Sequence, residues 1–179
     1  MVYTSHYDSS IGPLLLAGRD GKLAGVWIEG QKYFFGSLRE ETQERESSPV
    51  LRQAGLWLDR YFAGERPAIS ELPRAPIGSE FRKEVWQVLC EIPYGEMTTY
   101  GEISQKIATR RGLERMSAQA VGGAVGHNPI SIIVPCHRVV GSNGSLTGYA
   151  GGLEKKIKLL THEGVDKERL FVPRKGTAL

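Results

Sequence analysis

The sequence of 179 residues contains little cysteine, because Cys90 and Cys136 are its only two thiols. Two cysteines cannot build a cysteine-rich zinc site, and nothing else in the chain points to the disulfide framework of a small secreted protein. The four histidines show no spacing that is typical of metal ligands. We therefore expect two free thiols, no metal and no cofactor.

Long hydrophobic runs are also missing. No stretch contains the roughly 20 apolar residues that a membrane-spanning helix needs. The first ten residues, MVYTSHYDSS, lack the basic start and apolar run of a signal peptide. These absences predict a cytoplasmic protein without a membrane partner. The hydrophobic content of 40% is sufficient for one large domain or two small ones.

Neither sign of charge dominates the sequence, since the formal net charge is only +3. Between residues 103 and 141, however, basic side chains outnumber the single acid Glu114. They are Lys106, Arg110, Arg111, Arg115 and Arg138. A local basic excess is typical of proteins that bind a polyanion, although a solvated helical face has the same composition.

The first 75 residues predict a small β-rich domain. Residues 1–30 alternate or form short apolar runs separated by turn signals, which is typical of strands. Residues 48–64 then have apolar positions at helical spacing, with Ser48 as the expected cap and Gly64 at the end. Three prolines between residues 65 and 78 forbid a regular helix, so we place the domain boundary there.

Residues 79–165 predict a second, mostly helical domain, which makes the fold class α+β. Helical patterns cover residues 79–92, 99–112, 117–127 and 153–163. Thr99 and Glu102 have capping-box spacing, and Ser117 is a plausible cap for the next helix. Two short helices joined by a basic turn indicate a helix-turn-helix or winged-helix arrangement. We further expect a buried strand over residues 130–134 and a tail over residues 166–179 that is poorly ordered beyond its first residues.

Cys136 and His137 are adjacent in the segment Pro135-Cys136-His137-Arg138-Val139. An imidazole can draw the proton from a thiol and so lower its pKa, which activates the sulfur as a nucleophile. Sequence neighbours do not bring sulfur and nitrogen into direct contact without strain, so we predict a bridging water. A cysteine and histidine pair is also common as a purely structural feature.

Other residues allow both a functional and a purely structural interpretation. Glu163 lies at a helix C-terminus, where a carboxylate opposes the helix dipole, so it either orients an imidazole or is a solvated side chain. Gly122 and Gly123 lie inside a helical pattern and suit either a close approach of a ligand to the backbone or tight helix packing. Tyr100 and Tyr149 can stack on a base or simply pack.

The long run AVGGAVGHNPISIIVPCHRVVGSNGSLTGYAGG, followed by LLTHEG, resembles the O6-alkylguanine-DNA alkyltransferase family, also called methylated-DNA–protein-cysteine methyltransferases. The resemblance covers residues 79–165 strongly and is compatible with residues 1–75. It implies direct-reversal DNA repair, in which one alkyl group moves from O6-alkylguanine, and possibly O4-alkylthymine, to the protein in a single, self-inactivating turnover. The implied partner is double-stranded DNA with alkylated bases, bound by a monomer.

The resemblance assigns roles to individual residues. Cys136 matches the alkyl acceptor, His137 the water-mediated base and Glu163 the carboxylate that orients the imidazole. Asn128 matches a supporting asparagine, and Tyr100 the tyrosine that turns the phosphate and protonates guanine. The implied substrate pocket contains Tyr149, Gly148 and Val139. The implied DNA contacts are Ser117, Ala118, Gln119, Ala120, Gly122, Gly123, Arg110, Arg111 and Ser142.

One position departs from the family pattern. Gln119 stands where many members have an arginine that fills the gap left by the flipped nucleotide. Glutamine retains hydrogen-bond donors but lacks the cation and the flat stacking group. Three alternatives to alkyl transfer remain open at this level: a lesion-binding module without catalysis, a cysteine hydrolase, and a helix-turn-helix regulator.

Overall fold

The computed structural model describes residues 1–172, which divide into two compact units. The first unit comprises residues 1–78 together with the short segment 129–133. The second comprises residues 79–128 and the described chain from residue 134 onward. The chain therefore returns once to the first unit just before the cysteine-containing motif.

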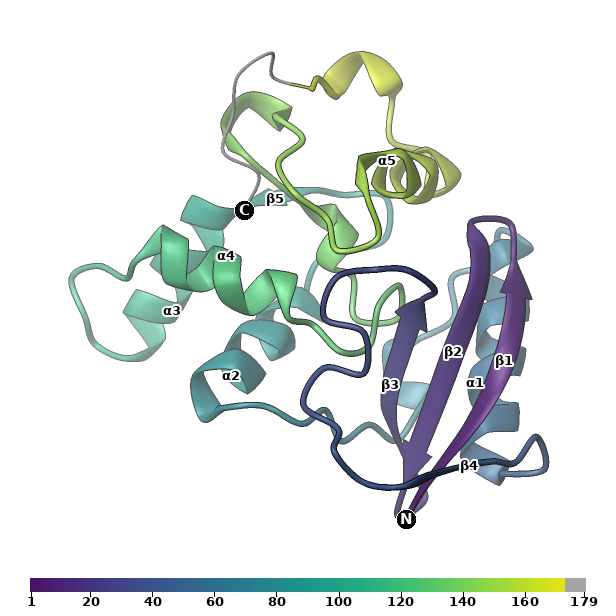
Figure 1. The fold of residues 1–179 in the computed structure, drawn as a ribbon. Coiled ribbons are helices and arrows are strands. Elements are labelled where there is room, and N and C mark those ends of the chain that lie inside the picture. Colours follow the sequence, from purple (N-terminus) through teal and green to yellow (C-terminus); the bar gives the residue numbers. More distant parts are fainter. Residues whose placement is uncertain (173–179) are drawn as a thin grey trace. The chain divides into compact units, whose positions relative to one another are not determined.

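The first unit contains a four-stranded sheet in the order β3-β2-β1-β4 (Figure 1). Its strands are β1 (Val2–Ser9), β2 (Gly12–Arg19), β3 (Lys22–Ile28) and β4 (Thr42–Glu44). β1, β2 and β3 form antiparallel pairs, whereas β4 runs parallel to β1. The predicted strands of residues 1–30 are thus confirmed, and β4 lies in a polar segment that carried no strand signal.

Helix α1 (Pro49–Phe62) follows the sheet and buries the apolar positions that predicted it, among them Leu51, Ala54 and Leu58. Pro49 suits the first helical position, since its fixed φ matches the helix and its missing N–H has no partner to lose there. Ser48 occupies the N-cap position as expected, but its side chain makes no capping hydrogen bond.

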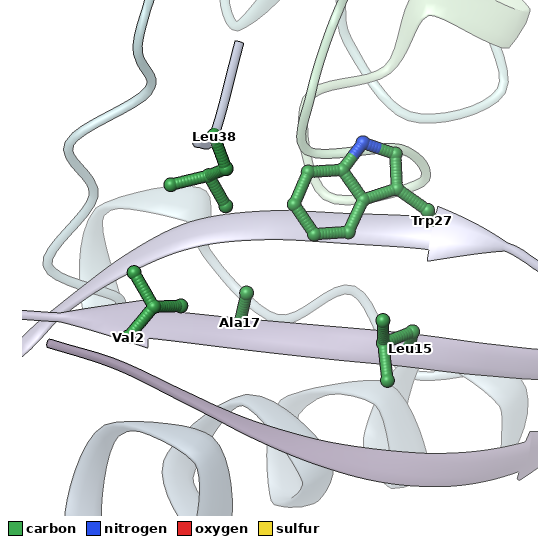
Figure 2. Packing of buried hydrophobic residues seen from close by; sticks show 5 residues of the cluster. All are labelled: Val2, Leu15, Ala17, Trp27 and Leu38. Atoms are coloured by element: carbon green, nitrogen blue, oxygen red, sulfur yellow. The ribbon is translucent and has the colours of Figure 1, made fainter. Parts of the chain in front are cut away.

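Alternate residues of the strands point into one core of the first unit. Figure 2 shows Val2, Leu15, Ala17, Trp27 and Leu38 of this cluster. Phe34, Phe35 and Ile77 pack against them as partly buried side chains. Leu15 and Ala17 are two residues apart on β2, so their side chains lie on the same face of the sheet.

The second unit is mostly helical, as predicted. Its elements are α2 (Glu80–Leu89), β5 (Thr98–Thr99), α3 (Tyr100–Arg110), α4 (Ala118–Gly126), β6 (Val139–Val140) and α5 (Leu153–His162). β5 and β6 form a short parallel pair. None of the helices in the described part of the chain is long and apolar enough to cross a membrane.

Helices α3 and α4 form the predicted helix-turn-helix pair. Thr99 and Glu102 make the full capping box of α3, and the Ser117 side chain accepts a hydrogen bond from the Ala120 amide at the start of α4. On the other side, the Trp86 indole of α2 donates to the Ala124 carbonyl at 2.8 Å. Local caps thus begin both helices, and a buried hydrogen bond holds α4 to α2.

The expected strand over residues 130–134 is wrong. Only Ile130 forms an isolated bridge, to Val26, and the following residues form a buried turn. The Ile133 amide bonds to the Ser131 carbonyl at 2.8 Å, and Ile132 has a φ of 72°. A residue in the left-handed region cannot continue a strand, so the apolar run is buried without being extended.

The chain after α5 continues as an ordered segment. Residues Lys167–Arg169 form one turn of 3-10 helix, and the Asp166 side chain caps it through the Glu168 amide at 2.9 Å. Our expectation of poor order for the end of the chain falls partly on residues 173–179, which lie outside the described residues.

Candidate active site

Cys136 begins a single turn of 3-10 helix, Cys136–Arg138, directly after Pro135. Only 6% of Cys136 is exposed. The Asn128 side chain hydrogen bonds to its thiol and also donates to the Val134 carbonyl at 2.8 Å. The thiol is therefore held by a tight turn and a buried amide.

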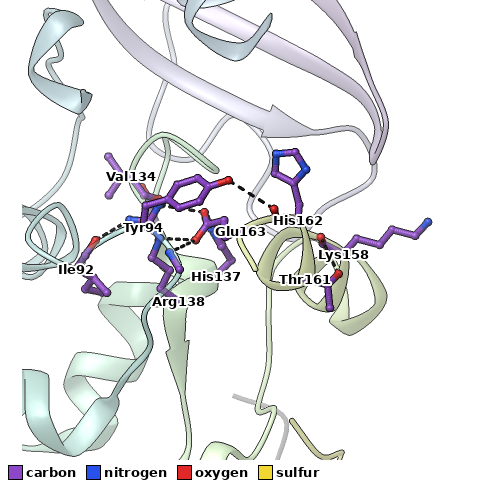
Figure 3. A network of polar contacts seen from close by, with 11 residues as sticks. Ile92, Tyr94, Val134, His137, Arg138, Lys158, Thr161, His162 and Glu163 are labelled. Carbon is purple, nitrogen blue, oxygen red and sulfur yellow. Dashed lines mark hydrogen bonds and ion pairs between the residues drawn. The ribbon is translucent and has the colours of Figure 1, made fainter. Parts of the chain in front are cut away.

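His137 lies in a buried network with Glu163 and Arg138 (Figure 3). His137 Nε2 and Glu163 Oε1 are 2.7 Å apart. Arg138 donates to both oxygens of the same carboxylate, at 2.8 and 3.0 Å, and to the Ile92 carbonyl at 2.6 Å. Because the carboxylate holds Nε2, the other ring nitrogen is directed elsewhere; His137 Nδ1 is buried and has no protein hydrogen-bond partner among residues 1–172.

The surroundings determine the charges in this network. Burial acts to raise the pKa of Glu163, but hydrogen bonds from His137 and Arg138 and the positive charge of Arg138 hold it well below its ordinary value. Burial lowers the pKa of His137, with the Glu163 charge opposing it. At neutral pH the network therefore contains an ionised carboxylate and a neutral imidazole, which is the form that can accept a proton.

The thiol itself does not follow our expectation of a lowered pKa. Burial raises the pKa of Cys136 above its ordinary value, while the Asn128 hydrogen bond and the positive charge of Lys156 oppose that rise. The protein without substrate thus favours the neutral thiol. A base would have to take the proton before this sulfur could act as a nucleophile, and the neutral imidazole of His137 is its neighbour in the sequence.

Lys156 is a site residue that sequence reasoning missed. It lies on α5, is fully buried, and donates to the carbonyls of Val139, Thr147 and Gly148 at 2.5, 3.1 and 3.5 Å. Burial lowers the pKa of Lys156 to about 8, and the charge of Cys136 opposes this effect. The sequence did contain a signal for Lys156. This residue directly precedes Ile157 and lies on the apolar face of the helix, where a charged side chain is unexpected.

Tyr100 and Tyr149 lie near the sulfur, because the charge of Cys136 acts on both phenols. Burial raises the pKa of both groups, and that of Tyr149 rises well above its ordinary value. The Tyr149 hydroxyl is buried and makes no hydrogen bond within the described chain. Both phenols are therefore neutral at neutral pH.

The predicted DNA contacts of α4 form an open surface. Ser117, Ala118, Gln119, Ala120 and Gly123 are exposed, whereas Gly122 is buried. A Cβ atom added to Gly123 would meet nothing within 4 Å. Close helix packing thus does not account for Gly123, although it suits the buried Gly122.

The predicted arginine contacts are engaged by acids. Arg110 binds Glu91 at 2.6 Å, and Arg111 binds Glu84 at 2.6 Å. Both acids lie before residue 103, outside the segment in which we counted the basic excess. In the folded protein they neutralise part of that excess. Ser142, in a turn of 3-10 helix after β6, is exposed.

The described residues contain no group of three or more His, Cys, Asp or Glu side chains that could hold a metal. The second cysteine, Cys90, follows α2 and is half-buried. The histidine and carboxylate pair described above is adjacent to Cys136 through His137.

Two family models match the chain. Residues 80–165 match the "6-O-methylguanine DNA methyltransferase, DNA binding domain", and residues 2–76 match the "6-O-methylguanine DNA methyltransferase, ribonuclease-like domain". The two matches together cover nearly the whole described chain. They agree with the two-unit division of the structure and with the fold class expected from the sequence.

Individual proteins are also similar. The methylated-DNA–protein-cysteine methyltransferase of Methanosarcina acetivorans is 45% identical over 164 residues, covering 91% of this chain and 99% of that protein. The Haemophilus influenzae protein of the same name is 38% identical, covering 92% and 87%. The crystal structure of Mycobacterium tuberculosis OGT in complex with DNA is 40% identical, with a TM-score of 0.76 and 94% of each chain covered.

Proposed function

Because the chain belongs to the 6-O-methylguanine DNA methyltransferase family, we propose that Cys136 is the residue that accepts the alkyl group. The chain is a methylated-DNA–protein-cysteine methyltransferase and repairs DNA by moving an alkyl group onto one of its own cysteines. The single observation that carries the assignment is the buried set of Asn128, His137 and Glu163 beside Cys136, since such a set suits a nucleophile with its own base.

The proton leaves the thiol through His137. Glu163 holds Nε2, so Nδ1 is the nitrogen that faces away from the carboxylate and takes the proton through one bridging water. The imidazolium that forms is stabilised by the ionised Glu163. Lys156 supplies a buried positive charge that stabilises the thiolate as it develops.

The sulfur then attacks the alkyl carbon. The bond from that carbon to O6 of guanine breaks as the carbon–sulfur bond forms, and guanine leaves as an anion or takes a proton from Tyr100. The product is a thioether, which water does not hydrolyse under mild conditions. Each protein molecule therefore acts once, and neither a metal nor a cofactor enters these steps.

The damaged base must leave the duplex to reach Cys136. We expect α4 to enter the minor groove with its exposed face, where Gly123 allows the sugar-phosphate backbone to approach closely. Rotation of the nucleotide costs a few kcal/mol, less for a poorly paired base. Gln119 occupies the position from which the gap in the duplex is filled, and Tyr149, Gly148 and Val139 line the pocket for the base.

Mass spectrometry of the intact protein tests the assignment. After mixing with a duplex that contains one O6-methylguanine, the protein should gain one methyl group, located on the peptide that contains Cys136. Cys136→Ser should gain none, and Cys90→Ser should react like the unchanged protein. Methyl on another peptide, or on none, would reject Cys136 as the acceptor.

The same experiment separates the alternatives. A lesion-binding module would retain the duplex without gaining mass, and a cysteine hydrolase would regenerate its thiol and turn over repeatedly. A sequence-specific regulator would bind without regard to the lesion. A second duplex with O4-methylthymine tests the wider substrate range, and sedimentation of the complex tests the expected monomer.

A further inference from the structure

We propose that residues 166–171, here called the C-terminal clasp, are positioning residues for the pocket that receives the base. They would act through the loop of residues 141–149, here called the wall loop, which ends at Tyr149. This inference rests on the proposed site, because it assumes that Tyr149 and Gly148 line the pocket. It adds to that site a segment that no feature of the sequence had connected to the reaction.

The wall loop has little regular structure of its own. It contains one turn of 3-10 helix, Ser142–Gly144. Its internal main-chain hydrogen bonds run from the Gly141 amide to the Ser145 carbonyl at 2.7 Å, from Ser145 to Ser142 at 3.2 Å and from Thr147 to Ser145 at 3.1 Å. Asn143 and Gly144 both have positive φ values, 60° and 79°. Because none of these bonds spans more than four residues, the position of the whole loop depends on contacts outside it.

The clasp supplies such contacts to the middle of the wall loop. The Leu146 amide donates to the Phe171 carbonyl at 2.8 Å, and Ser145 and Phe171 form an isolated parallel bridge. At Gly144 the two segments approach so closely that an added Cβ would overlap the main-chain oxygen of Arg169. The contact therefore requires glycine for space as well as for its backbone conformation.

A hydrophobic cluster fastens the clasp to the rest of the unit. Leu146 of the wall loop is buried with Val140, Leu160 and Val165, and Leu170 of the clasp packs against this cluster. Val140 belongs to β6, four residues after Cys136, and Leu160 belongs to α5. The same apolar group thus joins the clasp, the wall loop and the two elements that flank the nucleophile.

Lys156 secures the wall loop at its end, through the carbonyls of Thr147 and Gly148. The clasp secures its middle, and between them they determine where Tyr149 stands. The hydrogen bonds of the thiol and its base come from Asn128 and Glu163, which belong to other segments. Loss of the clasp should therefore displace the pocket wall and leave the thiol chemistry intact.

Two pairs of variants in the full chain test this inference. Gly144→Ala pushes against Arg169, and its control Gly112→Ala places the same methyl group at another positive φ, 66°, where nothing lies within 4 Å. Leu170→Ala removes the clasp side chain that packs in the cluster. Its control Leu56→Ala makes the same truncation on α1, at a residue that is 63% exposed.

Two rates and one affinity are measured for each variant, after a thermal unfolding curve has shown that the variant is folded. The rate of methyl transfer from an O6-methylguanine duplex at saturating protein should fall about tenfold or more in Gly144→Ala and Leu170→Ala, since small displacements of a substrate wall have large effects on rate. The rate of Cys136 alkylation by iodoacetamide and the affinity for an undamaged duplex should stay within about twofold of the unchanged protein.

Both control variants should transfer at the rate of the unchanged protein. Equal transfer by folded Gly144→Ala and Leu170→Ala would overturn the inference, and so would a parallel loss of iodoacetamide reactivity, which would indicate general damage to the site. A failure of the proposed function would look different, because the unchanged protein itself would then gain no methyl group on Cys136.

Discussion

Two sets of ion pairs in the second unit join similar side chains in opposite surroundings. His137, Arg138 and Glu163 are buried; hydrogen bonds keep the carboxylate ionised, whereas burial keeps the imidazole neutral. On the surface, Glu84 of α2 and Glu91, which follows α2, bind arginines at equally short distances, with side chains that are 25% to 40% exposed. The difference teaches that distance alone does not determine what an ion pair contributes.

Burial changes the consequences of losing a partner. An exposed pair is screened by water and contributes little to stability. A buried charge that loses its partner has no solvent to replace it, so the remaining charge is strongly destabilising. The surface pairs can therefore open for a phosphate group, whereas the buried network has to remain closed for Glu163 to orient His137.

The largest effect should follow from Glu163→Gln. It leaves Arg138 without its carboxylate, so the free energy of unfolding should fall by about 3 kcal/mol, as measured by urea denaturation. The rate of methyl transfer should fall about 100-fold, because His137 loses the group that orients it and stabilises its charge. Glu154→Gln is the control, since Glu154 is 83% exposed on the same helix.

The pH dependence has a defined sign for this variant. Because its partners hold the pKa of Glu163 below the ordinary value of 4.5, the stability from this group is complete above pH 4.5 and is lost on acidification. Glu163→Gln should lack that part of the acid sensitivity. A variant as acid-sensitive and as active as the unchanged protein would contradict the assigned network.

Lys156→Met should have an intermediate effect that depends on pH. The pKa of Lys156 falls from 10.5 to about 8 on folding, so its charge destabilises the folded protein below pH 8. As the pH rises from 8 to 10.5, the folded protein releases this proton before the unfolded chain does. The unchanged protein should therefore gain stability relative to Lys156→Met, on the order of 3 kcal/mol across this window.

Denaturation curves at several pH values check this expectation. Lys158→Met is the matched control, because Lys158 lies on the same helix with a side chain that is 54% exposed. It should show no comparable change between pH 8 and 10.5. If the difference in the free energy of unfolding between the unchanged protein and Lys156→Met did not change with pH, Lys156 would not be buried as a charged group.

The smallest effect should come from Glu91→Gln. Removing this exposed acid should change the free energy of unfolding by about 1 kcal/mol or less. It also releases Lys106 and Arg110 from their ion pairs. Fluorescence titration should show tighter binding to undamaged duplex DNA, with a steeper dependence on salt. Unchanged affinity and salt dependence would remove Arg110 from the phosphate contacts.

Local patterns predicted the elements wherever the residues act on their own neighbours. The capping box of Thr99 and Glu102 and the cap at Ser117 are such cases, because both partners lie within one turn. The run of residues 130–134 misled us, since an apolar run predicts burial but leaves the backbone conformation open. The buried turn at Ile132 depends on contacts with β3, which lies about a hundred residues earlier in the chain.

The candidate site shows the same division. Cys136, His137 and Glu163 were named from a motif, which identifies residue types but not their surroundings. Arg138 was counted as part of a basic surface, yet it is buried against Glu163. Lys156 was overlooked because its partners are main-chain carbonyls. Every residue has a main-chain carbonyl, so residue types do not identify such partners.

The amino-acid sequence by itself determined the class of the fold, the helices with their caps, and the nucleophile motif, because these depend on periodicity and on partners a few residues apart. The tertiary structure alone decided which charges are buried, which arginines are paired, and how residues 166–171 reach the loop of residues 141–149. Those properties depend on desolvation and on contacts between distant segments, and the chain acquires both only when it folds.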